Sequence, residues 1–119
     1  MSTTNLVLTE LSLGQASKEI TINENYWRLD ALTQGILQDI GYSDSDDATT
    51  TEGYLYFVSG TGANDWAGHD GELAHYFNDS WHFYTLQTGM RFWVVADTGV
   101  ASNTFQVWNG AAWQVITIT

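Results

Sequence analysis

The chain has 119 residues, no Cys, and three Lys and Arg against fourteen Asp and Glu, which gives a formal net charge of −11. This acidity argues against nucleic acids and anionic membrane surfaces as partners, and the absence of Cys excludes disulfides and thiolate metal sites. The length suits one domain, no apolar run approaches the roughly 20 residues of a membrane span, and the first residues lack signal-peptide features, so we expect a soluble, cytoplasmically made protein without membrane insertion.

Residues 1–21 lack the three-to-four spacing of a helix and are predicted to form an extended N-terminal arm. Leucines alternate at two short intervals, Leu6 with Leu8 and Leu11 with Leu13. This alternation suits either an edge strand on the chain's own sheet or a segment laid over a partner, and the residues alone favour neither. Leu6, Leu8 and Leu11 are therefore candidate anchor residues.

A single helix is predicted over about residues 24–40 of the module that spans residues 22–119. Asn23 suits an N-cap, and Gly41 suits the C-terminal cap. The favoured interpretation is that one apolar stripe of this helix covers a face of a sheet. An alternative uses Ile22, Leu29 and Ile36, seven residues apart, as the seam of a short helical bundle between subunits. The full stripe comprises Ile22, Tyr26, Leu29, Leu32, Ile36 and Ile40.

Two polar segments follow the helix and are predicted to be loops. Residues 42–52 are acidic, and three of their Asp residues could attract calcium. A calcium loop requires more oxygen ligands in a fixed order, so a solvated acidic loop is favoured. Residues 59–71 are rich in Gly but lack the Lys of a phosphate-binding loop, and we interpret them as a surface loop anchored by Trp66.

Residues 53–118 carry the signals of an antiparallel sheet of about six strands. Two hairpins share one design, in which an apolar strand, a polar turn and a return strand opening on Trp81 or Trp113 follow one another. The second hairpin has two registers, because a two-residue turn pairs Trp113 with Gln106 whereas a four-residue turn pairs it with Trp108. The fold class expected is therefore α+β, with the arm and one helix packed on a small sheet.

The predicted register of the first hairpin determines whether its two histidines can act together. A turn over residues 78–80 pairs Tyr76 with His82, which places His75 and His82 on opposite faces and prevents them from sharing a metal. His69 lies in a loop with no nucleophile motif around it. We therefore expect no catalytic residues, no bound metal and no cofactor, and we predict that the protein is not an enzyme.

The strand over residues 90–96 is apolar on both sides, with Phe92 and Val94 facing one way and Trp93 and Val95 the other. One helix can cover only one face of a sheet. Strands that are apolar on both sides imply cover on both faces, so the second face is expected to meet the arm, another subunit or a ligand.

Residues 14–24, GQASKEITINE, followed by the LDAL of residues 29–32, resemble the opening of the DUF2793 family. Later pieces follow that family in the same order and extend the resemblance over nearly the whole chain. They include Trp66-Ala67-Gly68, Gly71-Glu72, residues 89–93 and the VWNGAAW of residues 107–113.

The resemblance implies a structural protein of bacteriophages or gene-transfer agents, associated with tails, fibres or spikes. It implies localisation in the virion, after synthesis in the cytoplasm of the bacterial host, and partners among other virion proteins. No catalytic residue carries over from the family. A homotrimer is expected by analogy with viral spikes and fibres, which commonly have threefold symmetry.

The alternative is a carbohydrate-binding module that attaches to a host surface glycan through exposed aromatic side chains. Large aromatic residues suit sugar stacking as well as protein interfaces, although their clustering on strands favours core packing. The candidate glycan or interface aromatics are Trp66, Trp81, Trp93, Trp108 and Trp113.

Overall fold

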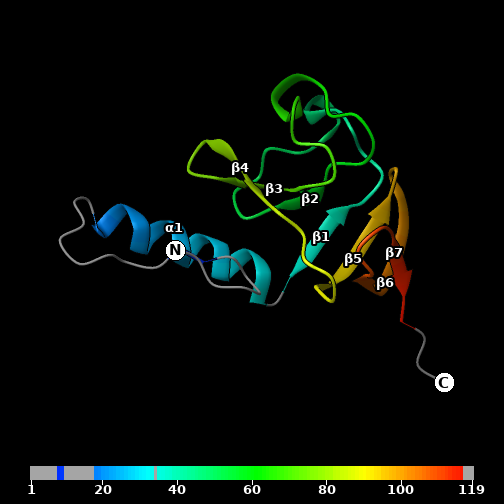
Figure 1. Cartoon of the computed structure of the whole chain (residues 1–119). Coiled ribbons are helices and arrows are strands. Elements are labelled where there is room, and N and C mark those ends of the chain that lie inside the picture. The colour runs from blue at the N-terminus through cyan, green and yellow to red at the C-terminus, as the bar shows by residue number, and fades with distance from the viewer. Residues whose placement is uncertain (1–7, 10–17, 34, 117–119) are drawn as a thin grey trace.

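The computed structural model describes residues 8–9, 18–33 and 35–116. Within these residues one helix packs on a seven-stranded mixed sheet, which confirms the α+β class and adds one strand to the number expected (Figure 1). The elements are α1 (Lys18–Thr33), β1 (Ile36–Asp39), the short 3-10 helix η1 (Ser45–Asp47), β2 (Leu55–Phe57), η2 (Asn64–Trp66), β3 (Leu73–Phe77), β4 (Ser80–Tyr84), β5 (Arg91–Asp97), β6 (Val100–Trp108) and β7 (Trp113–Val115).

The strands lie in the order β4-β3-β2-β1-β5-β6-β7. β1 runs parallel to both of its neighbours, whereas every other pair is antiparallel. The sheet therefore consists of two antiparallel halves, β2–β3–β4 and β5–β6–β7, which are joined along β1 (Figure 1).

The predicted helix bounds are wrong at both ends. α1 begins at Lys18, inside the predicted arm, and ends at Thr33, after which Ile36–Asp39 forms the central strand β1. The apolar residues between Ile36 and Ile40 fit a strand as well as a helix, and burial at the centre of the sheet decides between them: Leu37 is fully buried. Between the helix and the strand, Gly35 leaves room for a buried ring, since a Cβ there would lie 1.9 Å from Cδ1 of Phe92.

The C-terminal half of α1 packs on one face of the sheet through Trp27, Ala31 and Leu32. The predicted apolar stripe covers the sheet only in part, because its member Tyr26 is 63% exposed. The core on this face joins the end of the helix to both halves of the sheet, so β1 and its neighbours are buried together. Its buried members are Ala31, Leu32, Leu37, Leu55, Leu73, Tyr84, Phe92 and Val94.

The second face of the β2–β3–β4 half is covered by the two polar loops, which fold into a lid. Trp66 is fully buried in a second core with Tyr56, Val58 and Ala74. Hydrogen bonds join the two loops. The Asn64 side chain donates to the carboxylates of Asp44 and Asp46, and the Asp65 N–H donates to Ser45 Oγ. The loop-anchoring position predicted for Trp66 is thus present, and the acidic loop is part of the lid.

The first hairpin has a different register from the predicted one. His75 pairs with His82 and Tyr76 with Trp81, so the turn contains only Asn78 and Asp79, both with positive φ. These are the backbone angles of a tight two-residue turn, which Asn and Asp accept. His75 and His82 therefore lie on the same face, contrary to the prediction.

The second hairpin has the longer of the two registers left open. Trp108 pairs with Trp113 across residues 109–112. The side chain of Asn109 accepts the N–H groups of Ala111 and Ala112 at 2.9 and 2.8 Å, which stabilises the four-residue loop and explains why it is preferred over a two-residue turn.

Candidate functional site

The uncovered part of the sheet is the second face of β1, β5 and β6. Ile36 pairs with Trp93, and Trp93 pairs with Phe105, so the three side chains form one row on the same face. Their exposed fractions are 49%, 43% and 37%. We call this row the apolar row. The sheet has apolar residues on both faces, as expected. On the second face, the two loops cover the β2–β3–β4 half and leave the apolar row exposed.

A groove of about 880 Å³ runs beside the apolar row, and we call it the assembly groove. Its walls come from the end of α1 at Leu32, from the row itself, and from the β4–β5 connection over residues 87–90. The described lining contains one cation, Arg91, and no Asp or Glu. The chain has fourteen acidic residues, yet none of them is among the described residues that line this surface.

The candidate aromatics mostly pack against one another. Trp66 is fully buried and has no face to offer a sugar. Trp81 is half-buried with its ring centroid 5.3 Å from that of Trp66, and Trp108 and Trp113 contact each other at 5.2 Å. Trp93 is the candidate with the most exposed side chain. Aromatic content alone does not distinguish a packed Trp from an exposed one, whereas the alternation of residues along β5 places Trp93 on the uncovered face.

The candidate anchor residues do not form one seam. Ile22 and Leu29 are half-buried on α1, but Ile36 lies on β1, so the seven-residue helical seam is interrupted. Leu8 is half-buried, whereas Leu6 and Leu11 lie outside the described residues. What the arm does therefore remains a prediction, except at the neighbouring Thr9, whose N–H and C=O are both hydrogen-bonded to the Asn25 side chain, at 2.9 and 2.7 Å.

The three histidines have different environments. His75 is fully buried and shares a hydrogen bond of 2.8 Å with the Tyr84 hydroxyl. Burial lowers the pKa of His75 to about 4 and raises the pKa of Tyr84 to about 12. His82 Nε2 lies 3.0 Å from the carbonyl oxygen of Phe77. Within the described part of the chain, no three His, Asp or Glu side chains are placed to hold a metal ion.

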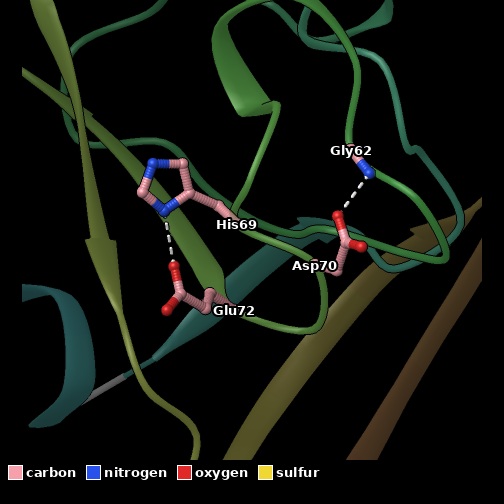
Figure 2. Close-up of polar contacts among 4 residues, drawn as sticks. All are labelled: Gly62, His69, Asp70 and Glu72. Atoms are coloured by element: carbon pink, nitrogen blue, oxygen red, sulfur yellow. Dashed lines mark hydrogen bonds and ion pairs between the residues drawn. The ribbon is translucent and has the colours of Figure 1, made fainter.

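His69 is oriented by a carboxylate. Its Nδ1 donates to Oε1 of Glu72 at 2.7 Å, while the adjacent Asp70 carboxylate accepts the Gly62 N–H at 2.7 Å (Figure 2). The imidazole lies flat on the ring of Phe83, with 3.5 Å between centroids. The Glu72 contact leaves Nε2 as the ring nitrogen open to another partner.

A smaller pocket of about 340 Å³ lies between α1 and β4, and we call it the α1–β4 pocket. Its lining includes the cation Arg28, whose guanidinium carbon lies 4.4 Å from the centroid of the Tyr84 ring. Partial burial lowers the pKa of Arg28 from its ordinary value. Sequence reasoning did not identify this pocket, because it requires α1, β4 and the His69 loop to meet. The lining residues are Thr9, Glu24, Asn25, Trp27, Arg28, His69, Trp81, His82, Phe83 and Tyr84.

The architecture defines an α+β domain with one helix on a mixed sheet and with one sheet surface uncovered. The family model of DUF2793, a protein family of unknown function, matches residues 22–114, and the chain belongs to this family. Comparisons with curated proteins and with solved structures found no match. The helix that the structure describes is too short and too polar to cross a membrane.

Proposed function

We propose that this protein is a non-enzymatic structural module of a phage virion, and that it assembles with copies of itself through the apolar row and the assembly groove. The observation that carries the proposal is the row formed by Ile36, Trp93 and Phe105, which continues across three strands. Adjacent apolar side chains on a flat sheet surface are typical of protein interfaces, where Trp and Phe are enriched.

The distribution of charge supports a second copy as the occupant. Two copies that each carry a charge of −11 repel one another over most of their surfaces. The described residues that line the assembly groove include Arg91 and no carboxylate, so copies can approach here without these residues placing negative charges opposite each other.

The size of the interface favours use of the whole groove. A stable interface buries about 800 Å² on each partner, which is more than three partly exposed side chains supply. The walls at Leu32 and at residues 87–90 provide further surface beside the row. A homotrimer located in a tail, fibre or spike remains the arrangement that we propose, by analogy with proteins that the sequence resembles.

Sedimentation of a charge-insertion variant tests the proposal. Wild-type protein at micromolar concentration is expected to sediment near three times 13.3 kDa, about 40 kDa, and Trp93→Glu near 13.3 kDa. Trp93 is already part-exposed, so the substitution should leave the thermal unfolding transition in place.

The matched control is Val100→Glu, which adds the same charge at another exposed apolar side chain on β6, outside the groove lining. This variant should retain the wild-type mass. A wild-type monomer, or an equal loss of assembly in both variants, would show that the apolar row is not the interface.

A further inference from the structure

The α1–β4 pocket shares no lining residue with the assembly groove, so a function there is independent of assembly. The helix supplies polar and aromatic side chains from one side, β4 supplies aromatic residues from another, and the loop carrying His69 closes a third. Its volume of about 340 Å³ lies at the lower end of the range for small-molecule sites. The pocket can therefore hold a single small ring.

Among the described residues Arg28 forms no ion pair, although the nearby carboxylate of Glu24 interacts with it electrostatically. Among the described residues, the ion pair joins His69 to Glu72, and none of the hydrogen bonds involves the guanidinium of Arg28. One face of the guanidinium contacts the Tyr84 ring, and the N–H donors in its plane have no hydrogen-bond acceptor among the described residues. A half-buried cation without a hydrogen-bonded anion is unfavourable, so a planar anion that accepts two N–H groups would satisfy it.

The surrounding charge limits which anion fits. Glu24 lines the same pocket, one helical turn before Arg28, and it is exposed and beyond ion-pair distance. Together with the charge of −11, this carboxylate disfavours ligands with several negative charges. A single carboxylate matches the fork of the guanidinium better than a phosphate chain does.

The remaining lining is suited to a sugar ring. Trp27, which packs against Phe77 and His82, and His69, which stacks on Phe83, line the pocket with aromatic rings. Aromatic rings can contact the apolar face of a pyranose while polar edges bind its hydroxyl groups. His69 Nε2 is left open by the Glu72 contact, and His82 engages Phe77 through Nε2, which leaves its Nδ1. Each imidazole therefore offers one nitrogen for a hydroxyl group.

We infer that the α1–β4 pocket binds a sugar that carries one carboxylate, of the hexuronic acid type. Arg28 holds the carboxylate, Trp27 and the His69–Phe83 pair contact the ring, and the two imidazoles bind hydroxyl groups. This site differs from the exposed-tryptophan platforms suggested by composition, since Arg28 and Trp27 come from α1.

Titration calorimetry with sodium glucuronate on the whole chain tests the inference. Wild type should bind glucuronate. Methyl glucoside lacks the carboxylate, sodium acetate lacks the ring, and inorganic phosphate lacks the single planar charge, so each should bind at least about tenfold more weakly. Equal binding of acetate or phosphate would overturn the sugar assignment, and no heat with glucuronate would overturn the site.

Arg28→Gln should weaken glucuronate binding at least about tenfold, because a charge-assisted bidentate contact is lost. Arg91→Gln removes the same charge on a different surface and should leave binding unchanged; an equal loss in both variants would overturn the role of Arg28. Since Arg28→Gln also loses the contact with Tyr84, substitution of the exposed Glu24 by Gln provides a second test that keeps this contact.

Glu24→Gln should strengthen glucuronate binding by about two- to threefold, because the competing carboxylate is removed. Unchanged or weaker binding would contradict the assignment of the carboxylate to Arg28. Arg28 and Glu24 do not line the assembly groove, so failure here leaves the assembly proposal standing, and a monomeric wild type leaves this site standing.

Discussion

At the scale of single residues, Asp39 holds the centre of the sheet to a distant turn. Its carboxylate is buried and accepts the N–H groups of Gly41, Thr98 and Gly99, at 2.7, 2.8 and 2.7 Å. Thr98 and Gly99 form the β5–β6 turn with positive φ, an uncommon angle for a β-branched residue. By accepting these N–H groups, the Asp39 carboxylate offsets the backbone strain of a turn about 60 residues away in the sequence.

Asp39→Asn should lower the free energy of unfolding by about 2 to 4 kcal/mol, because one accepting oxygen becomes an NH₂ donor that faces backbone N–H groups. Urea denaturation measures the change. Asp65→Asn, at an exposed position, is the matched control and should stay within about 0.5 kcal/mol of wild type. Equal stability of both variants would contradict the role of Asp39.

The burial of His75 predicts a pH dependence of stability. Its pKa is about 4 in the folded protein, below the ordinary 6.5, so the unfolded chain binds the proton first as the pH falls. Stability should therefore decrease between about pH 6.5 and about pH 4, and by about 1 to 2 kcal/mol between pH 7 and pH 5. Urea midpoints across this window measure it.

His75→Gln removes the titrating group, so the slope of stability against pH above pH 5 should become flatter in this variant. A wild-type protein whose stability rises on acidification through this range would show that His75 is not held neutral.

At the scale of elements, the junction between α1 and β1 depends on Gly35. A Cβ at this position would meet Cδ1 and Cε1 of Phe92 at 1.9 and 2.3 Å, and Phe92 is almost fully buried. The core therefore has no room for a side chain where the helix ends and the strand begins.

Gly35→Ala should destabilise the protein by at least about 2 kcal/mol, as measured by denaturant unfolding, because the Phe92 ring must leave its position. In a double-mutant cycle with Phe92→Leu, the two changes should couple favourably, since the smaller side chain relieves the contact. Strictly additive effects would mean that the clash is absorbed elsewhere.

The sequence predicts the elements whose signals are local. The Asn-containing turns identified both hairpins, and the alternation over residues 90–96 correctly assigned Phe92 and Trp93 to opposite faces. β1 was missed because its apolar residues also continue the helical spacing, and only burial between β2 and β5 distinguishes the two structures. The first hairpin register was missed because Asn78-Asp79 supports turns of two lengths.

The two candidate sites depend on tertiary contacts. The apolar row joins residues separated by more than fifty positions at Ile36 and Trp93, and the parallel pairing that aligns them has no local signal. The α1–β4 pocket likewise requires Arg28 to face β4 and His69. The sequence predicted Trp93 and Ile36 as separate candidates, but only the folded structure shows that they are neighbours on one face of the sheet.

At the scale of the whole molecule, the proposed assembly would balance apolar burial against self-repulsion. Each copy carries a charge of −11, whereas Arg91 is the one charged side chain among the described residues that line the proposed interface. Salt shortens the range of repulsion, from about 10 Å at 0.1 M to about 3 Å at 1 M, and leaves apolar burial in place. Association should therefore become tighter in salt, opposite to the behaviour of an interface made of ion pairs.

Raising sodium chloride from about 0.05 M to about 0.5 M should shift the wild-type distribution toward the oligomer in sedimentation runs, while Trp93→Glu should remain monomeric at both concentrations. The unfolding transition measured in the same buffers controls for changes in fold. Dissociation of the wild type in salt would show that its copies are held by charge.

The parallel strand β1 also determines how the molecule would respond to mechanical force. A pull on α1 enters the sheet at Ile36, where β1 runs between β2 and β5 in the same direction as both. Its hydrogen bonds on the two sides would be loaded in shear, so several must yield together rather than one after another. A tether attached through the helix would therefore be mechanically strong.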